Sequence, residues 1–425
     1  MDATTTNDQV SSTHIPDDIA FSILCKLPLK SLKRFSCVQK SWSRLFQNPN
    51  FMNMFRTNFF KTKHDDEDDE KTCLLLKKYT QSAPRYHSLC TLSAERFEDQ
   101  VKLHLPPSFQ YHDDSTSLIR FNVLGSTSVN GTLCLYGGCW RYPITTILWN
   151  PATREFEIIP PSLEPYKNIE FNLRPQGFGY NSVKEDYKVI CNVEYLLNSG
   201  DEWIYLPSKG NPFWESVVRE FDLNDYLWEE EEFLVDCKHD PFWEIYSLKS
   251  NSWRKLDGVD MPLPCPGRSH VNLDECFHWL SLHDKMVSFD FSKEKFFVKA
   301  LPSESNVIHT LVESNLVVLN GSVSLIYNYD KMYFRIWILG ELGVKESWSK
   351  LFVLGPSNCL VRSIGAGKKS HIFFREVESD GLAWFDFSTM TGSEIWITGD
   401  SVCEQIVIYK ENFLPLRGMK NWLSI

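Results

Sequence analysis

The sequence predicts an α+β multidomain protein, in which a small all-α bundle is followed by an all-β propeller. Between residues 13 and 60 the apolar residues recur every three or four positions, as on one face of a helix. After residue 73, short apolar strands alternate with polar turns, and the pattern returns after about 48 residues. The acidic run "KTKHDDEDDEK" at residues 61–71 separates these two parts.

The composition is that of a folded protein with a substantial core. Of the 425 residues, 43% are hydrophobic and 14% are aromatic, which argues against wholesale disorder. The formal net charge is −11. Because affinity for nucleic acid depends on Lys and Arg neutralising phosphates, this charge argues against a nucleic-acid partner.

Targeting features of the sequence favour the cytoplasm, the nucleus or both. The amino end, "MDATTTNDQVSST", has neither the basic start nor the apolar core of a signal peptide. No run approaches the ~18 apolar residues that would span a membrane, so no membrane association is expected. Twelve cysteines are scattered singly along the chain, which predicts buried, reduced thiols.

The first predicted helix lies in "IPDDIAFSILCKLP". Ile15, Ile19, Ile23 and Leu27 are four residues apart, which places them along one helix face, and Leu24 falls in the same stripe. Pro16 suits the first turn of a helix, where its missing N–H costs nothing. Pro28 ends the helix because its ring would clash with the preceding turn.

Further short helices are expected up to residue 60. Leu32 and Phe35 face inward on the second, Val38 and Trp42 lie together on the third, and residues 51–59 carry another apolar seam with Phe51, Met54 and Phe55. So small a bundle is marginal on its own. Residues 15–60 carry a net charge of +5 and the rest of the chain about −16, which favours a docking element over a merely solvated helix face.

The stretch "IPDDIAFSILCKLPLKSLKRFSCVQKSW" resembles an F-box. The resemblance covers residues 15 to about 46, with Ile15 in place of the commoner Leu. It implies docking to a Skp-type adaptor and, through it, to a cullin scaffold and the ubiquitin-transfer machinery. The residues that it assigns to adaptor binding are Ile15, Pro16, Ile19, Ile23, Leu27, Pro28, Leu32, Val38 and Trp42.

The predicted domain organisation has four parts. Residues 1–12 form a disordered tail, residues 13–60 the helical domain, residues 61–72 an acidic linker and residues 73–425 the propeller. Residues 201–240 fit the repeat poorly and are interpreted as an irregular acidic insertion. The linker carboxylates lack the spaced pattern of a metal site, so no metal is expected there.

Pairs of aromatic residues seven positions apart mark the repeat. Trp149 and Phe156, Tyr246 and Trp253, and Phe289 and Phe296 each flank a polar turn, as expected for hairpins. Trp337 and Phe385 anchor similar segments with longer turns. Because 97 residues separate Trp149 from Tyr246, one degenerate unit is expected near residue 197. The anchors predict six blades, with seven as the alternative and residues 73–106 helping to close the ring.

A second turn type has the same period. Asn130-Gly131 and Asn320-Gly321 are 190 residues apart, and each lies between apolar runs, which is the strongest short signal for a tight hairpin. A hairpin at Asp274 precedes Asn320 by 46 residues, and Gly367 follows it by 47. Two hairpins per repeat make four strands, which is the blade of a β-propeller.

The second part also resembles a known family. The segments "LWNPATREFEIIPP", "GFGYNSVKEDYKVI", "YSLKSNSWRKL", "FHWLS", "VSFDFSKEKF", "FRIWIL", "GVKESWSKLF" and "LAWFDF" look like the F-box-associated domain of plant F-box proteins, in the expected order. The chain is similar in general to the group that includes the S-locus F-box proteins. Nothing in residues 201–240 favours that branch.

The sequence contains no catalytic constellation. His278 and His283 are expected on opposite faces of a strand, and Cys134 and Cys139 as isolated thiols, so no metal and no cofactor are predicted. "GAGKKS" lacks the residues of a phosphate loop and is interpreted as a hairpin turn. The repeated tryptophans are expected in the core, with a sugar-binding shelf as the alternative.

These observations predict the substrate-recognition subunit of a Skp-cullin-F-box ubiquitin ligase. The helical domain would bind the adaptor, the propeller would bind an unidentified protein target for ubiquitination, and catalysis would take place elsewhere in the complex. The rival interpretation is a carbohydrate-binding or enzymatic propeller with an incidental helical cap. The sequence identifies neither the target nor the substrate-binding residues.

Overall fold

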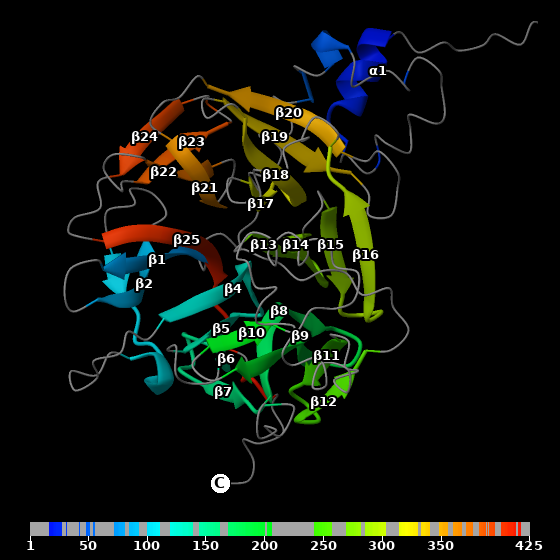
Figure 1. Cartoon of the computed structure of the whole chain (residues 1–425). Helices are drawn as coiled ribbons and strands as arrows, with labels where there is room; N and C mark the ends of the chain where they lie inside the picture. Colours follow the sequence, from blue (N-terminus) through cyan, green and yellow to red (C-terminus); the bar gives the residue numbers. More distant parts are fainter. Residues whose placement is uncertain are drawn as a thin grey trace, which may run out of the picture. The chain divides into compact units, whose positions relative to one another are not determined.

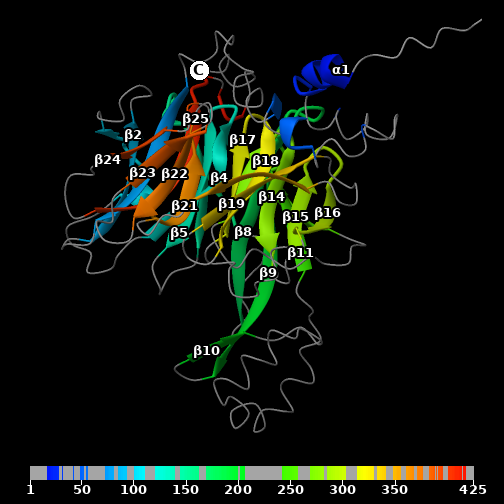
Figure 2. The ribbon, with the colours of Figure 1, turned by 90° about the horizontal axis from the view of Figure 1, so that it is seen from above.

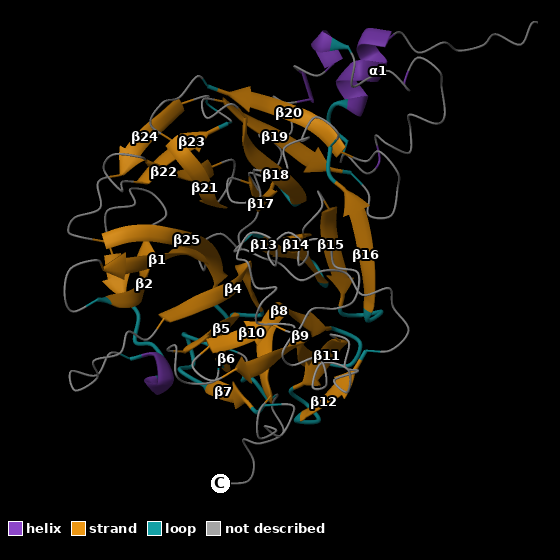
Figure 3. Ribbon diagram, in the orientation of Figure 1, coloured by secondary structure: helices purple, strands orange, loops and turns teal. Residues whose placement is uncertain are grey.

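The chain divides into two compact units, Met1–Asp66 and Glu67–Ile425. The computed structural model contains helix in the first unit and mainly strand in the second (Figures 1 and 3). It describes residues 17–27, 31, 42, 48–51, 54–55, 72–80, 85–92, 100–110, 120–138, 144–161, 169–199, 202–205, 242–256, 269–281, 285–302, 314–329, 333–340, 348–355, 360–367, 371–376, 382–387, 389, 391–395, 401–413 and 415–417.

The described strands of the second unit form an eight-stranded sheet, a five-stranded sheet and three four-stranded sheets. A single parallel bridge, Ile408↔Thr127, divides the eight-stranded sheet into two antiparallel halves of four strands, the closing sheet and the second sheet, so the ring has six antiparallel sheets in all. The closing sheet contains β25 (Ser401–Lys410), β1 (Thr72–Thr80), β2 (Tyr86–Leu92) and β3 (Gln100–Lys102), and is followed by a short 3₁₀ helix, η3 (Pro107–Phe109). The second sheet contains β4 (Arg120–Val129), β5 (Thr132–Gly138), β6 (Thr145–Trp149) and β7 (Phe156–Ile159). The third sheet contains β8 (Ile169–Asn181), β9 (Asp186–Ser199), β11 (Phe242–Ser247) and β12 (Ser252–Lys255), with β10 (Glu202–Tyr205) added to β9.

The remaining three sheets follow the chain order strictly. The fourth contains β13 (His270–Leu273), β14 (Cys276–Ser281), β15 (Lys285–Asp290) and β16 (Lys295–Ala300). The fifth contains β17 (Ser314–Leu319), β18 (Ser322–Tyr329), β19 (Tyr333–Leu339) and β20 (Trp348–Leu354). The sixth contains β21 (Leu360–Ala366), β22 (His371–Glu376), β23 (Leu382–Asp386) and β24 (Thr391–Ile395).

The six sheets follow one another around a ring (Figure 1). The first strand of each sheet packs against its neighbour: β17 against β21, β21 against β25, β25 against β4, β4 against β8, and β13 against β17. Hydrophobic clusters fill the spaces between sheets, for example around Trp243 and Trp279 between the third and fourth sheets. The prediction of an all-β body built from four-stranded sheets is therefore confirmed.

The aromatic pairs that marked the repeat are direct cross-strand neighbours. Trp149 pairs with Phe156, Tyr246 with Trp253, and Phe289 with Phe296, each across the last two strands of a sheet. Such pairs stabilise a hairpin because their rings lie close together on one face. The spacing is thus set by the tight turn, since in two of the hairpins the turn is separated from the aromatic pair by one further strand pair, Ser247↔Ser252 or Asp290↔Lys295.

The expectation of a degenerate unit near residue 197 is wrong. Residue 197 lies in β9, the second strand of the third sheet, and the third strand of that sheet is β11 with Tyr246. β8 and β9 have 13 and 14 residues and are followed by β10, so one sheet uses the length of chain that the period assigned to two. The total of six sheets is nevertheless reached, because the closing sheet takes the place of the unit that was expected near residue 197.

The closing sheet joins the two ends of the second unit. Strand β1 pairs with β25 over nine register positions, from Thr72↔Lys410 to Thr80↔Ser401. Lys77 is buried in this sheet, and its Nζ lies 2.6 Å from Glu404 Oε2 and 3.1 Å from Asn122 Oδ1 on β4. A buried cation needs such partners, so these contacts also fix β4 against the closing sheet.

A polar contact near the centre of the ring fastens β4 to β13. The register of β4 with β5 shifts between Leu124 and Val129, which frees the intervening backbone. Asn272 Oδ1 accepts hydrogen bonds from the N–H groups of Ser126 (3.1 Å) and Thr127 (2.9 Å), and Asn272 Nδ2 donates to Thr127 O (2.8 Å). One side chain thus replaces the pairing with β5 that the shifted segment lacks, next to the single parallel bridge between Thr127 and Ile408.

Replacing Asn272 by Ala should lower the free energy of unfolding by about 2–4 kcal/mol, because it leaves several backbone groups without these partners. Chemical denaturation of the full chain measures the change. Asn315→Ala is the matched control: Asn315 Nδ2 donates a hydrogen bond to Ser363 O at 2.9 Å, and losing it should cost about 1 kcal/mol. Equal losses for the two variants would contradict the assigned role of Asn272.

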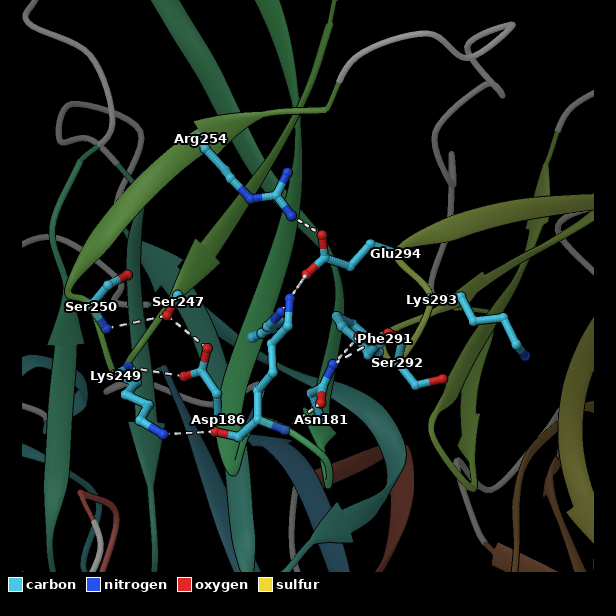
Figure 4. Close-up of polar contacts among 12 residues, drawn as sticks. Asn181, Asp186, Ser247, Lys249, Ser250, Arg254, Phe291, Ser292, Lys293 and Glu294 are labelled. Atoms are coloured by element: carbon cyan, nitrogen blue, oxygen red, sulfur yellow. Dashed lines mark hydrogen bonds and ion pairs between the residues drawn. The ribbon is translucent and has the colours of Figure 1, made fainter.

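The turns between the third and fourth sheets carry a network of charged groups (Figure 4). Glu294 binds Lys188 and Arg254 of the third sheet, and Lys184 Nζ lies 3.4 Å from its Oε1. Asn181 Nδ2 donates to Phe291 O at 2.9 Å, which adds a neutral link between the same sheets. The network therefore fixes the spacing of two neighbouring sheets.

Candidate functional site

The predicted site begins on helix α1 (Asp17–Leu24) of the first unit. One side of this short helix is buried: Ala20, Leu24 and the following Cys25 are each less than 5% exposed. The ring of Phe21 meets that of Phe51 edge-on at 5.6 Å between centroids, and Phe51 stacks on Phe55 at 6.1 Å. These aromatic contacts complete the inner side of α1.

The other side of α1 exposes two large aliphatic residues. Ile19 is 49% exposed and Ile23 is 55% exposed. Because residues four apart lie one above the other on a helix, they form a continuous apolar stripe. Met54, which is 37% exposed, adds a third apolar side chain at the surface of the same unit. Exposed apolar groups gathered in so small a unit are typical of a protein-binding surface.

The predicted adaptor-binding residues divide into two groups. Ile19, Ile23, Leu27 and Trp42 lie within the described residues, where Leu27 and Trp42 are half-buried and the two isoleucines are exposed. The remaining five lie outside the described residues: Ile15, Pro16, Pro28, Leu32 and Val38. Their part in binding stays a prediction.

Leu24 and Met54 differ from the simple sequence pattern. Leu24 belongs to the same apolar stripe in the sequence as Ile23, but it is buried against the inner side of the unit. Met54 belongs to the seam of residues 51–59, but Phe51 and Phe55 occupy the interior and leave it at the surface. Periodicity alone gave no signal for this division, because α1 is apolar over more than half of its circumference.

The repeated tryptophans of the second unit are packing residues. Trp149 is buried, while Trp253 is partly buried and donates from Nε1 to Pro160 O at 2.7 Å. Trp337, Trp348 and Trp384 pack against hydrophobic clusters between sheets. The interpretation as a core residue is therefore confirmed for Trp149, whereas the other four are partly buried side chains that pack against the edges of these clusters.

The histidine and cysteine candidates that the structure describes are buried. His278 is 2% exposed, and its Nδ1 lies 2.7 Å from Ser288 Oγ. Cys134 is fully buried, and this burial raises the pKa of its thiol. His283 and Cys139 lie outside the described residues. Within the described part of the chain, no three His, Cys, Asp or Glu side chains gather as metal ligands would.

The buried imidazole predicts a pH dependence of stability. Burial lowers the pKa of His278 from 6.5 to about 4, so the folded state takes up its proton at lower pH than the unfolded state. Stability should therefore be complete above pH 6.5 and fall as the pH drops toward 4, by at most about 1.4 kcal/mol per pH unit. Denaturant unfolding at pH 7 and pH 5 should show this loss, and His278→Asn should reduce it. An unchanged difference in the variant would exclude His278 as its source.

Each of the two units contains a segment that matches the model of a known protein family. Residues 88–416 match the family model described as the F-box associated beta propeller domain. The chain belongs to this family. Residues 13–53 match the model of the F-box domain, so the exposed stripe of α1 is part of an F-box. As a member of the F-box protein family, the chain is a non-catalytic component of the ubiquitin-ligase machinery.

Individual relatives are plant F-box proteins. The F-box protein CPR1 of Arabidopsis thaliana is 23% identical over 410 residues, which cover 90% of this chain and 84% of that protein. F-box protein At3g07870 of the same plant is 26% identical over 344 residues, covering 80% and 72%. Among solved structures, a chain of the nidogen/laminin complex is 10% identical, with a TM-score of 0.42, covering 80% of this chain and 99% of that one.

Among the described residues, no helix has the length and apolar character needed to cross a bilayer.

Proposed function

We propose that this F-box protein is the substrate-recognition subunit of a Skp-cullin-F-box ubiquitin ligase. The observation that carries the proposal is the exposed stripe of Ile19 and Ile23 on a helix whose opposite side is already packed. A Skp-type adaptor would cover this stripe, and the residues predicted from the sequence, among them Leu27, Leu32 and Trp42, would extend the interface.

The second unit would hold the target. Its six sheets are proposed to close as a six-bladed propeller over residues 73–425, after a linker at residues 61–72 and the F-box at residues 13–60. A receptor bound to the cullin scaffold through its adaptor raises the effective concentration of the target near the ubiquitin carrier. The proposed location is the cytoplasm, the nucleus or both, where this machinery operates.

Co-purification tests the proposal directly. The full chain, co-expressed with a Skp-type adaptor, should elute with it in a stoichiometric complex and recruit a cullin scaffold added afterwards. A glycan-binding screen of the same preparation addresses the rival interpretation, a carbohydrate-binding propeller. Binding to glycans without binding to the adaptor would overturn the proposed function.

A further inference from the structure

Strand β7 exposes two large apolar side chains on one face of the second sheet. Phe156 is 39% exposed and Ile158 is 52% exposed, and we call them the β7 pair. Their cross-strand partners, Trp149 and Ile147, are buried in the hydrophobic cluster between the second sheet and the closing sheet. The β7 pair therefore continues that apolar face to the perimeter. Among the strands whose side chains the structure describes, β7 is the one that exposes two large hydrophobic residues.

Strand β7 lies at the outer edge of its sheet (Figure 1). Within the described part of the chain it pairs with β6 alone. Glu157 lies between the two members of the β7 pair and belongs to the opposite face, because successive residues of a strand alternate. Its cross-strand partner, Leu148, is buried in the cluster shared with the third sheet. A segment held at Glu157 is thus only one residue, or about 3.3 Å along the strand, from each member of the pair.

The chain after β25 reaches this strand. β25 runs beside β4 in the body of the second unit (Figure 2), so the residues that follow it start next to the second sheet. Leu416 is buried in the cluster shared with the third sheet, and its N–H donates to Glu155 Oε2 at 3.1 Å. Arg417 donates from Nε to Glu157 Oε1 at 2.7 Å and from Nη2 to Glu157 Oε2 at 2.9 Å. This bidentate contact ties the chain to β7 immediately before residue 418.

The composition and length of residues 418–425 suit them to cover the β7 pair. This segment, "GMKNWLSI", has one charged side chain, Lys420. Its four apolar residues are Met419, Trp422, Leu423 and Ile425. Eight residues span up to about 26 Å, whereas the width of one strand is about 4.8 Å. The segment is therefore long enough to cross from the face of Glu157 to the face of the β7 pair.

We propose that residues 418–425 fold back across the outer edge of β7 and cover Phe156 and Ile158 with their apolar side chains. The inference is independent of the proposed function, because it concerns a contact within the second unit. Burial of apolar surface drives the contact. The bond between Arg417 and Glu157 sets its place, since a tethered segment has a high effective concentration at the neighbouring surface. A contact of this kind closes the β7 pair to other proteins.

Photo-crosslinking of the purified full chain tests the contact. Replacing Ile158 by p-benzoylphenylalanine places a photoreactive group on β7, and mass spectrometry of the digested products identifies what it reaches. The expected product is a monomeric chain in which position 158 is joined to residues 418–425. Position 158 joined only to another segment of the chain, only to a second copy, or to nothing would overturn the proposal.

Val298 provides the matched control for this experiment. Its side chain is also 52% exposed on an outer strand, but the strand is β16 of the fourth sheet. The same photoreactive group at position 298 should give no product with residues 418–425. Equal yields of that product from positions 158 and 298 would also overturn the proposal.

Labelling of a cysteine at the same position gives an independent measure. In the Ile158→Cys chain, maleimide labelling at position 158 should become at least about fivefold faster when Trp422→Asp and Leu423→Asp are added, because carboxylates oppose burial against an apolar face. Mass spectrometry of the labelled peptides separates this site from the native cysteines. The Val298→Cys chain should be labelled at one rate with or without the two Asp substitutions. An unchanged rate at position 158, or an equal rise at position 298, would overturn the proposal.

Discussion

Replacing Ile23 by Asp is expected to abolish co-purification with the Skp-type adaptor. Ile23 is 55% exposed on α1, so a carboxylate is tolerated in the free protein, but adaptor binding would bury it against an apolar surface. The expected loss of affinity is at least about 100-fold, or roughly 3 kcal/mol. Isothermal titration calorimetry with the adaptor, or co-purification from co-expressing cells, measures it.

Val183→Asp is the control for this substitution. Val183 is 85% exposed in the turn between β8 and β9 of the second unit, so the same change of charge is made away from the F-box. It should leave adaptor binding unchanged. The combined Leu27→Ala and Leu32→Ala variant should also weaken binding while the second unit stays folded. Full adaptor binding by the Ile23→Asp protein would remove α1 from the interface.

Replacing Gly131 by Val should cause a large loss of stability, about 3–5 kcal/mol, for two reasons that add. Gly131 has φ of +74° in the Asn130-Gly131 turn, where a β-branched residue is strained. A Cβ there would lie 2.6 Å from Asn412 Cβ and 2.9 Å from Asn412 N. Asn412 belongs to the segment after β25, and its carbonyl oxygen accepts a hydrogen bond from Asn150 Nδ2 at 2.8 Å.

Gly321→Val separates the two causes. Gly321 has nearly the same backbone conformation, with φ of +70° in the Asn320-Gly321 turn, and this substitution should cost only the strain of about 1–2 kcal/mol. Thermal unfolding of both variants beside the unchanged chain gives the comparison. If Gly131→Val lowered the unfolding temperature no more than Gly321→Val, the packing of the terminal segment against the Asn130 turn would be disproved.

Local pairing was readable from the sequence. The partners Trp149 and Phe156, like Tyr246 and Trp253, are close in the chain, so the turn between them fixes which residues face each other. The Asn-Gly turns follow the same logic, because their positive φ values are a property of the two turn residues themselves. These features gave the four-stranded repeat correctly, and they gave the period for every sheet after the third.

The error near residue 197 has a different origin. A period counts residues, and an extended hairpin can use the same number of residues as an additional pair of strands. The lengths of β8 and β9 depend on their mutual pairing outside the body, which residue spacing does not record. The long β8–β9 hairpin with β10 beside it was therefore missed by the sequence argument, although residues 201–240 were recognised as irregular.

By itself, the sequence determined the class of this protein: an amino-terminal helical motif with apolar stripes, followed by hairpins whose turns and aromatic pairs specify four-stranded sheets. Only the tertiary structure decided which aliphatic residues of α1 remain at the surface: α1 packs on Phe51 through Phe21, and in this packing Leu24 is buried while Ile19 and Ile23 are exposed. It also decided how the ends of the second unit meet, since β1 and β25 are more than 320 residues apart. Local interactions can be read from spacing, whereas burial and long-range pairing depend on partners that no local pattern names.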